Sequence, residues 1–184
     1  MLRSAKNESQ IKDQRVLYVR LPCNPIFPIG VVYLADHVHK CFADVEQQIF
    51  DMGTVPPLDF TAVLDHRIDA FKPTILVFSW RDIQIYAPDG GRGGNPLQNA
   101  FEFNYARTPL LKMRGAMGGL RMISTYLNEL WQYTGLITRG LKRAKRYCSD
   151  VKLVVGGGAV SVFYEQVASM MPKGSIVSVG EGGV

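Results

Sequence analysis

The chain has 184 residues and a net charge of +5, with 47% apolar and 20% charged residues. This balance favours one globular domain and excludes a disordered chain, which would carry fewer apolar residues. No apolar run reaches the roughly 18 residues of a membrane span. No signal-peptide core follows Met1, and the three scattered cysteines indicate reduced thiols in a cytoplasmic protein.

The first half of the chain alternates between predicted strands and helices. Residues 1–14 are polar and predict a mobile leader, so the domain is expected to span 15–184. Strands are predicted at 16–21, 45–50 and 74–79, because each is a short run rich in apolar and β-branched residues. A loop with three prolines (22–30) leads into a helix that ends near residue 42, and a second helix is predicted over 60–71 with Asp59 as its N-cap.

The alternation is interrupted by an insertion from about 82 to 120 that is rich in Gly, Asn and Pro. A connection of this length is typical of a lid, a binding loop or an interface. Asn95 and Pro96 predict a short helix within it, which continues to Tyr105. The cluster of Phe101, Phe103 and Tyr105 favours packing against a partner domain or over a bound cofactor.

The second half of the chain resumes the pattern. A long helix is predicted over 122–146, with Gly135 and Gly140 as weak points, followed by a strand at 151–155. A helix over about 162–170 and a strand at 176–179 complete the prediction. The expected fold is therefore α/β and flavodoxin-like (Rossmann-type), with a five-stranded parallel sheet in the order 2-1-3-4-5.

Three glycines, Gly156, Gly157 and Gly158, follow the predicted strand at 151–155. Ligands of open α/β sheets bind beyond the carboxyl ends of the strands, and glycine lets a ligand approach the backbone closely. The run matches neither a dinucleotide-binding fingerprint nor a phosphate loop. An ordinary strand-to-helix turn is the alternative interpretation.

Basic residues are concentrated between 107 and 146, where nine of them accompany one acid, Glu129. Such a segment is compatible with a solvated helix face, an acidic partner or a phosphate-bearing ligand. No nucleic-acid-binding motif accompanies it, so neither nucleic acid nor a membrane is an expected partner.

Candidate catalytic groups are sparse. His37 and His39 point to different faces of one helix, which is poor geometry for a shared metal, and His66 lies mid-helix among polar residues. Asp51, Asp82 and Glu181 follow strands, but no nucleophile or zinc motif accompanies them. The sequence favours a binding domain over a self-sufficient catalyst.

Four segments together resemble the N-terminal cobalamin-binding domain of cobalamin-dependent radical S-adenosylmethionine enzymes. The segments are Leu21–Gly30 with the following Val31–Ala35, then Lys72–Ser79, Val154–Val160 and Val179–Gly182. They resemble that family's proline-rich loop and Tyr-Leu-Ala helix, its third strand, its Gly-Gly position and its closing Gly-Glu-Gly-Glu. The resemblance spans residues 16–182 and leaves the insertion uncovered.

The resemblance implies a base-off cobalamin without a histidine below the cobalt, since the Asp-x-His-x-x-Gly loop of other cobalamin domains is absent. The Cys-x-x-x-Cys-x-x-Cys motif is absent from residues 1–184, so the 4Fe-4S cluster and S-adenosylmethionine are expected in a downstream radical domain of the same chain. The fragment alone is then not catalytic. The parent enzyme is expected to be a methyltransferase or to catalyse a related radical reaction.

The resemblance also implies a set of cofactor-binding residues. The glycines at 156–158 and Ser79 would receive the nucleotide tail, and Trp80 and Arg81 would approach the lower corrin face, with core packing as the alternative for Trp80. Gly157→Val is expected to abolish binding and leave the fold intact. A flavodoxin-like nucleotide-binding or regulatory module without cobalamin is the alternative function. The full set is Pro22, Asn24, Pro25, Gly30, Ser79, Trp80, Arg81, Gly156, Gly157, Gly158, Ala159, Gly180 and Glu181.

Overall fold

A computed structural model describes residues 13–22, 28–80, 105 and 107–180. The strands are β1 (Arg15–Arg20), β2 (Glu46–Asp51), β3 (Ile75–Ser79), β4 (Lys152–Gly156) and β5 (Ile176–Val177). The α-helices are α2 (Ile29–Cys41), α3 (Phe60–Phe71), α5 (Pro109–Ala144), α6 (Gly158–Val162) and α7 (Tyr164–Met170). Two 3-10 helices, Met52–Thr54 and Pro57–Asp59, connect β2 to α3.

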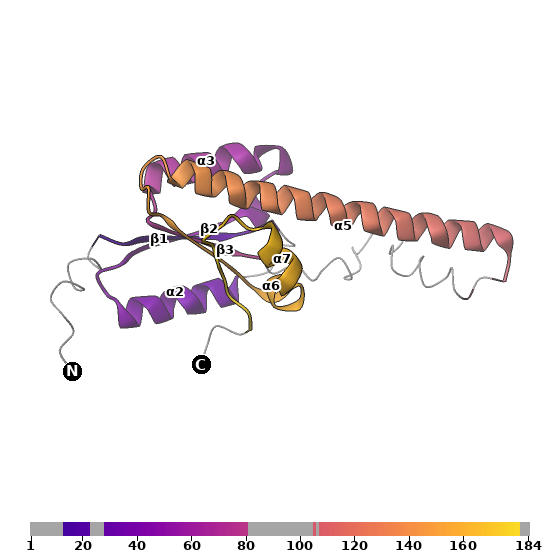
Figure 1. Cartoon of the computed structure of the whole chain (residues 1–184), viewed down its shortest axis with the longest axis horizontal. Helices are drawn as coiled ribbons and strands as arrows, with labels where there is room; N and C mark the ends of the chain where they lie inside the picture. Colours follow the sequence, from indigo (N-terminus) through magenta and orange to yellow (C-terminus); the bar gives the residue numbers. More distant parts are fainter. Residues whose placement is uncertain (1–12, 23–27, 81–104, 106, 181–184) are drawn as a thin grey trace. The chain divides into compact units, whose positions relative to one another are not determined.

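The five strands form one parallel sheet in the order β2-β1-β3-β4-β5, which confirms the predicted flavodoxin-like topology. Figure 1 shows α2 on one face of this sheet and α3 on the other. The chain divides into two compact units: residues 1–82 with 134–184, which contain the sheet, and residues 83–133. Within the second unit, the structure describes residues 105 and 107–133.

The face of the sheet toward α3 packs against buried apolar side chains. Leu76 and Phe78 of β3 are fully buried, as are Leu64 and Ile68 of α3. The C-terminal part of α5 packs closely on the same face through Gly140, where an added Cβ would lie 3.0 Å from Phe78 Cζ. Gly140 was expected to weaken the helix, but α5 runs through it unbroken because the missing side chain permits this contact.

The opposite face is closed over β1 and partly open over the later strands. Val16 and Tyr18 form a cluster with Val31 of α2, and Val77 of β3 packs against it. Farther along the sheet, Ile176 of β5 is 54% exposed. The central strands therefore have one buried face, toward α3, and the opposite face is partly accessible at β4 and β5.

Several elements differ from the predicted ones. The helix α5 begins at Pro109 rather than near residue 122, since Thr108 Oγ1 accepts a hydrogen bond from the Leu111 N–H and proline suits a first helical turn. Of the helix predicted over about 162–170, residues 164–170 form α7, and a separate short helix, α6, precedes it and ends at Val162. The strand β5 has two residues rather than four. Asp59 takes the predicted N-cap position of α3 but its side chain makes no capping bond.

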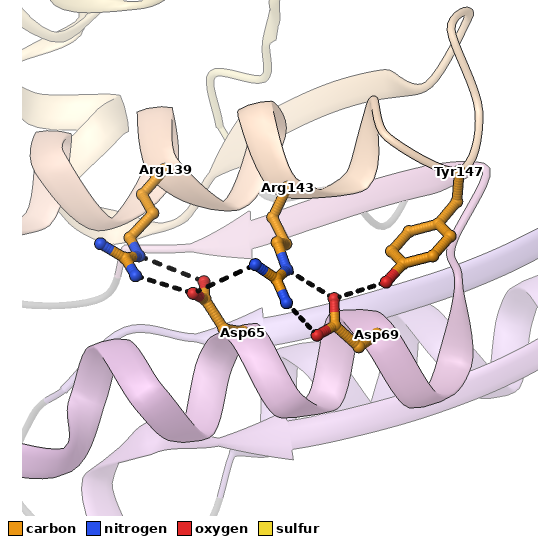
Figure 2. Close-up of polar contacts among 5 residues, drawn as sticks. All are labelled: Asp65, Asp69, Arg139, Arg143 and Tyr147. Carbon is orange, nitrogen blue, oxygen red and sulfur yellow. Dashed lines mark hydrogen bonds and ion pairs between the residues drawn. The ribbon is translucent and has the colours of Figure 1, made fainter.

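An ion-pair network joins α3 to the last part of α5 (Figure 2). Arg139 donates to both carboxylate oxygens of Asp65, and Arg143 pairs bidentately with Asp69. The Tyr147 hydroxyl donates to Asp69 Oδ1 at 2.9 Å. Two of the nine basic residues between 107 and 146 therefore hold helices of this domain together rather than facing an external partner.

This network predicts an acid-sensitive contribution to stability. Hydrogen bonds from Arg143 and then Tyr147 lower the pKa of Asp69 from 3.8 to about 2. Because the folded state has the lower pKa, the stabilisation is present above pH 3.8 and is lost as the pH falls toward 2. We expect Asp69→Asn to flatten the fall in unfolding free energy over that range, measured by urea denaturation. Asp44→Asn, at an exposed loop position, is the control, and an equal flattening there would contradict the assignment.

Candidate functional site

The carboxyl edge of the sheet carries a row of four residues in register. Arg20 of β1 lies between Asp51 of β2 and Ser79 of β3, and Ser79 is level with Gly156 of β4. Side chains alternate along a strand, so Arg20 and Ser79 share the α2 face with Tyr18 and Val77. The row therefore borders the face that is partly open.

The charged members of this row form a buried ion pair. Arg20 Nη1 lies 2.7 Å from Asp51 Oδ2, and the arginine residue is 1% exposed. The other carboxylate oxygen accepts a hydrogen bond from the Gly53 N–H at 2.8 Å, which fixes the turn after β2. Sequence analysis missed Arg20, although a charged residue at the end of an apolar strand was a visible signal.

The glycines after β4 have a structural explanation. Gly157 has φ +113° and ψ 178°, a conformation that is essentially restricted to glycine. A Cβ at this position would lie 2.5 Å from the Trp80 carbonyl oxygen. The expectation that Gly157→Val would leave the fold intact is therefore wrong, because the protein's own backbone occupies the space.

The segment around Trp80 is locked onto β4 and α6. The Trp80 N–H donates to the Gly156 carbonyl at 2.7 Å, and the Ala159 N–H donates to the Trp80 carbonyl at 3.1 Å. Trp80 and Ala159 are 6% and 3% exposed. Trp80 thus has the burial expected from the core-packing alternative, with little ring surface left for a ligand.

Ser161, which sequence analysis did not single out, links the loops after β4 and β5. Its hydroxyl donates to the Gly157 carbonyl at 3.2 Å and accepts from the Gly180 N–H at 2.9 Å. Gly180 has φ +93° and has open space where a side chain would stand. The two loops are therefore positioned together at the carboxyl edge.

Two predicted site residues leave accessible space. Gly30 is exposed in the first turn of α2, and nothing lies within 4 Å of an added Cβ. Ser79 is half-buried at the end of β3. In contrast, Pro22 is buried in the second position after β1, and a Cβ at Gly156 would contact Ser178 Cβ at 3.3 Å. Gly158 is half-buried as the first residue of α6, and Asn24, Pro25, Arg81 and Glu181 lie outside the described residues.

No catalytic constellation is assembled among the described residues. His37, His39 and His66 are all exposed on helices, and the described part of the chain contains no cluster of three metal-ligating side chains. Burial raises the pKa of Tyr18 to about 12, and its hydroxyl donates to Gln47 Oε1 at 2.9 Å. Tyr18 therefore stays protonated near neutral pH as a structural group.

No known protein-family model matches this sequence, and no curated protein or solved structure resembles it significantly. Across the helices that the structure describes, none combines the length and apolar character needed to cross a bilayer. A function is consequently inferred from the residues at the carboxyl edge of the sheet.

Proposed function

We propose that this chain is a cofactor-binding α/β domain that holds base-off cobalamin at the carboxyl edge of its sheet. In this proposal it serves a radical S-adenosylmethionine enzyme, and the chain alone performs no reaction. Bound cobalamin would supply methyl-transfer or radical-assisting chemistry. The protein's part is to bind the cofactor, orient it and exclude water.

The observation that carries the proposal is the position of the topological switch. The order β2-β1-β3 sends the connections from β1 and β3 to opposite faces, and a crevice for ligands lies between such connections. Helices that follow parallel strands begin at the carboxyl edge, so Gly30 of α2 borders this crevice. Ser79 ends the strand on its other side.

The described residues fit a large, partly polar cofactor on one face only. Gly30, Ser79 and the open face over β4 and β5 are accessible to a nucleotide tail, and Gly180 leaves additional space beside them. The turn at Gly157 is filled by the Trp80 backbone, so it does not provide a tail channel. The proposal therefore assigns the tail to the α2 face of the sheet.

The histidines agree with a base-off cofactor. His37 and His39 lie in the last turns of α2, far along the helix from Gly30, and His66 lies in the middle of α3. None of the three ends a strand. Cobalt above the carboxyl edge would accordingly have no histidine ligand from this domain.

One observation favours a second function, a nucleotide-binding or regulatory module without cobalamin. Gly157 is explained by the Trp80 backbone and Gly156 by its close contact with Ser178, so these glycines do not require a ligand. A direct test of cobalamin binding distinguishes the two functions.

We expect hydroxocobalamin to bind the chain and change its visible absorption, and the reduced complex to show no nitrogen superhyperfine splitting in electron paramagnetic resonance. We expect Gly30→Leu to weaken binding at least tenfold, because a bulky side chain would enter the crevice without displacing protein atoms. Leucine also favours helix more than glycine does, so the variant should fold.

Gly135→Leu is the matched control, since Gly135 is also an exposed helical glycine with open space around an added Cβ. It should bind cobalamin like the unmodified chain. Absence of any spectral change with the unmodified chain would exclude cobalamin and leave the second function. Nitrogen splitting would refute the base-off state, and equal binding by both variants would refute the crevice.

A further inference from the structure

The part of α5 within residues 109–133 carries a stripe of apolar residues that faces solvent. Its residues are between 45% and 74% exposed. They are spaced alternately by three and four residues, except at position 124, where a serine takes the place of an apolar residue. This spacing is the seam of a two-helix coiled coil rather than the wider face of a helix buried in a globular core. The stripe consists of Leu110, Met113, Met117, Leu120, Leu127 and Trp131.

The stripe lies opposite the buried side of the helix. Gly115 and Gly118 are buried, and residues two apart on a helix point in nearly opposite directions. Gly115 lies two residues from both Met113 and Met117, and Gly118 lies two residues from Leu120. The stripe is consequently a separate surface of about 32 Å in length.

A basic residue borders this stripe. Arg114 is exposed and takes the position after the second apolar residue of its heptad, and in the sequence arginine recurs seven residues to either side, at 107 and 121. Side chains at that position flank the seam and select a partner by charge. Residues 107–128 contain four basic residues and no acidic one.

We infer that this stripe is a docking surface for an acidic amphipathic helix. The alternating spacing calls for apolar residues at the same spacing on the partner. The basic residues beside the stripe, Arg114 among them, call for aspartate or glutamate at the partner's flanking positions. This inference concerns residues 110–131 alone and is independent of any cofactor at the carboxyl edge.

The charge pattern disfavours the other occupants. A second copy of this helix would bring only arginines as charged flanking residues, since residues 107–128 contain no acid, and would form no complementary charge pairs along the interface. Leu111 and Ile123 are also exposed in this part of α5 but lie outside the alternating spacing. A membrane surface favours a continuous apolar face, whereas Ser124 interrupts this stripe.

The test uses the whole chain and two synthetic peptides of about four heptads with leucine at both seam positions. One peptide has glutamate at every flanking position and the other has lysine, so neither pairs well with itself. The chain has two tryptophans; Trp80 is 6% exposed and Trp131 is 74% exposed. Binding should therefore shift the emission of Trp131 to shorter wavelength, and Trp131→Phe should remove that signal.

We expect saturable binding of the acidic peptide, at least about tenfold tighter than the basic peptide, and weakened by salt. Leu120→Lys should reduce the affinity about a hundredfold, since it places a charge in the seam. Arg114→Glu should lower the affinity for the acidic peptide roughly fivefold and raise the affinity for the basic peptide. Lys112→Glu is the matched control, because it makes the same charge change at an exposed position away from the seam and should alter affinity less than about twofold.

Three results would overturn the inference. The first is equal binding, or no binding, of the two peptides. The second is self-association of the chain that Leu120→Lys abolishes, which would identify a second copy as the occupant. The third is a shift of Trp131 emission on vesicles of phosphatidylglycerol but not with the acidic peptide, which would identify a membrane surface.

Discussion

Gly157→Ala is expected to lower the unfolding free energy by roughly 3–5 kcal/mol or to prevent folding. Two effects add at this residue. Its backbone, at φ +113° and ψ 178°, lies in a region that a side chain makes costly, and the new Cβ would stand 2.5 Å from a backbone oxygen of Trp80. That oxygen accepts the hydrogen bond from the Ala159 N–H, so it cannot move away without breaking the turn.

Gly174→Ala separates the two effects. Gly174 also has a positive φ, +88°, but nothing lies within 4 Å of an added Cβ. It should therefore show only the cost of backbone strain, on the order of 1–2 kcal/mol. Urea unfolding of both variants measures the difference. Equal losses of unfolding free energy at the two sites would mean that the structure shifts to avoid the contact with Trp80. Close packing would then not be the reason for a glycine at position 157.

The fold was predictable because its signals are local. Runs such as Ile75–Ser79 and Lys152–Gly156 are short and apolar, and the helices between them keep a helical spacing of apolar residues. Once strands and helices alternate, right-handed crossovers leave few possible strand orders. The predicted order 2-1-3-4-5 followed from these rules and is confirmed.

The start of α5 was not predictable from the same signals. Gly115, Gly118 and Gly119 each cost helix stability, so the segment before residue 122 was interpreted as part of a glycine-rich insertion. The structure continues the helix through them, and Gly115 and Gly118 are buried. The helix therefore continues through all three glycines despite their low intrinsic helix propensity.

The candidate site was only partly predictable, because the reason for a glycine lies in contacts that are distant in sequence. Gly157 and Trp80 are 77 positions apart, and their contact exists only once β3 and β4 pair. The sequence placed these glycines at the carboxyl edge of the sheet, but it could not distinguish a glycine beside open space from one that admits a neighbouring backbone. Nothing lies within 4 Å of an added Cβ at Gly30, whereas the Trp80 backbone occupies that space at Gly157.

The pair Arg20–Asp51 poses the same question for a charged residue. A buried arginine at the carboxyl edge is placed either to bind an anionic ligand or to hold β1 against β2. The side chain of Arg20 is 2% exposed and that of Asp51 is 24% exposed. Since its guanidinium already contacts a carboxylate at 2.7 Å, we assign Arg20 a structural role.

Asp51→Asn is therefore expected to lower the unfolding free energy by about 3 kcal/mol, because it removes the carboxylate that pairs at 2.7 Å with the buried charge of Arg20. Asparagine retains a side-chain oxygen for the Gly53 N–H, so the turn is preserved. The double variant Arg20→Met with Asp51→Asn should recover much of the loss, since removing both charges from a buried site is often close to neutral. Urea unfolding of the two variants and the unmodified chain measures this coupling.

The double variant also decides between the two roles of Arg20. If Arg20 is structural, the refolded double variant should bind hydroxocobalamin as the unmodified chain does, because Gly30 and Ser79 are unchanged. A stable double variant that has lost binding would instead assign the arginine to the ligand. A cost below about 1 kcal/mol for Asp51→Asn would show that other partners already compensate the charge, and that the ion pair does not hold β1 and β2 together.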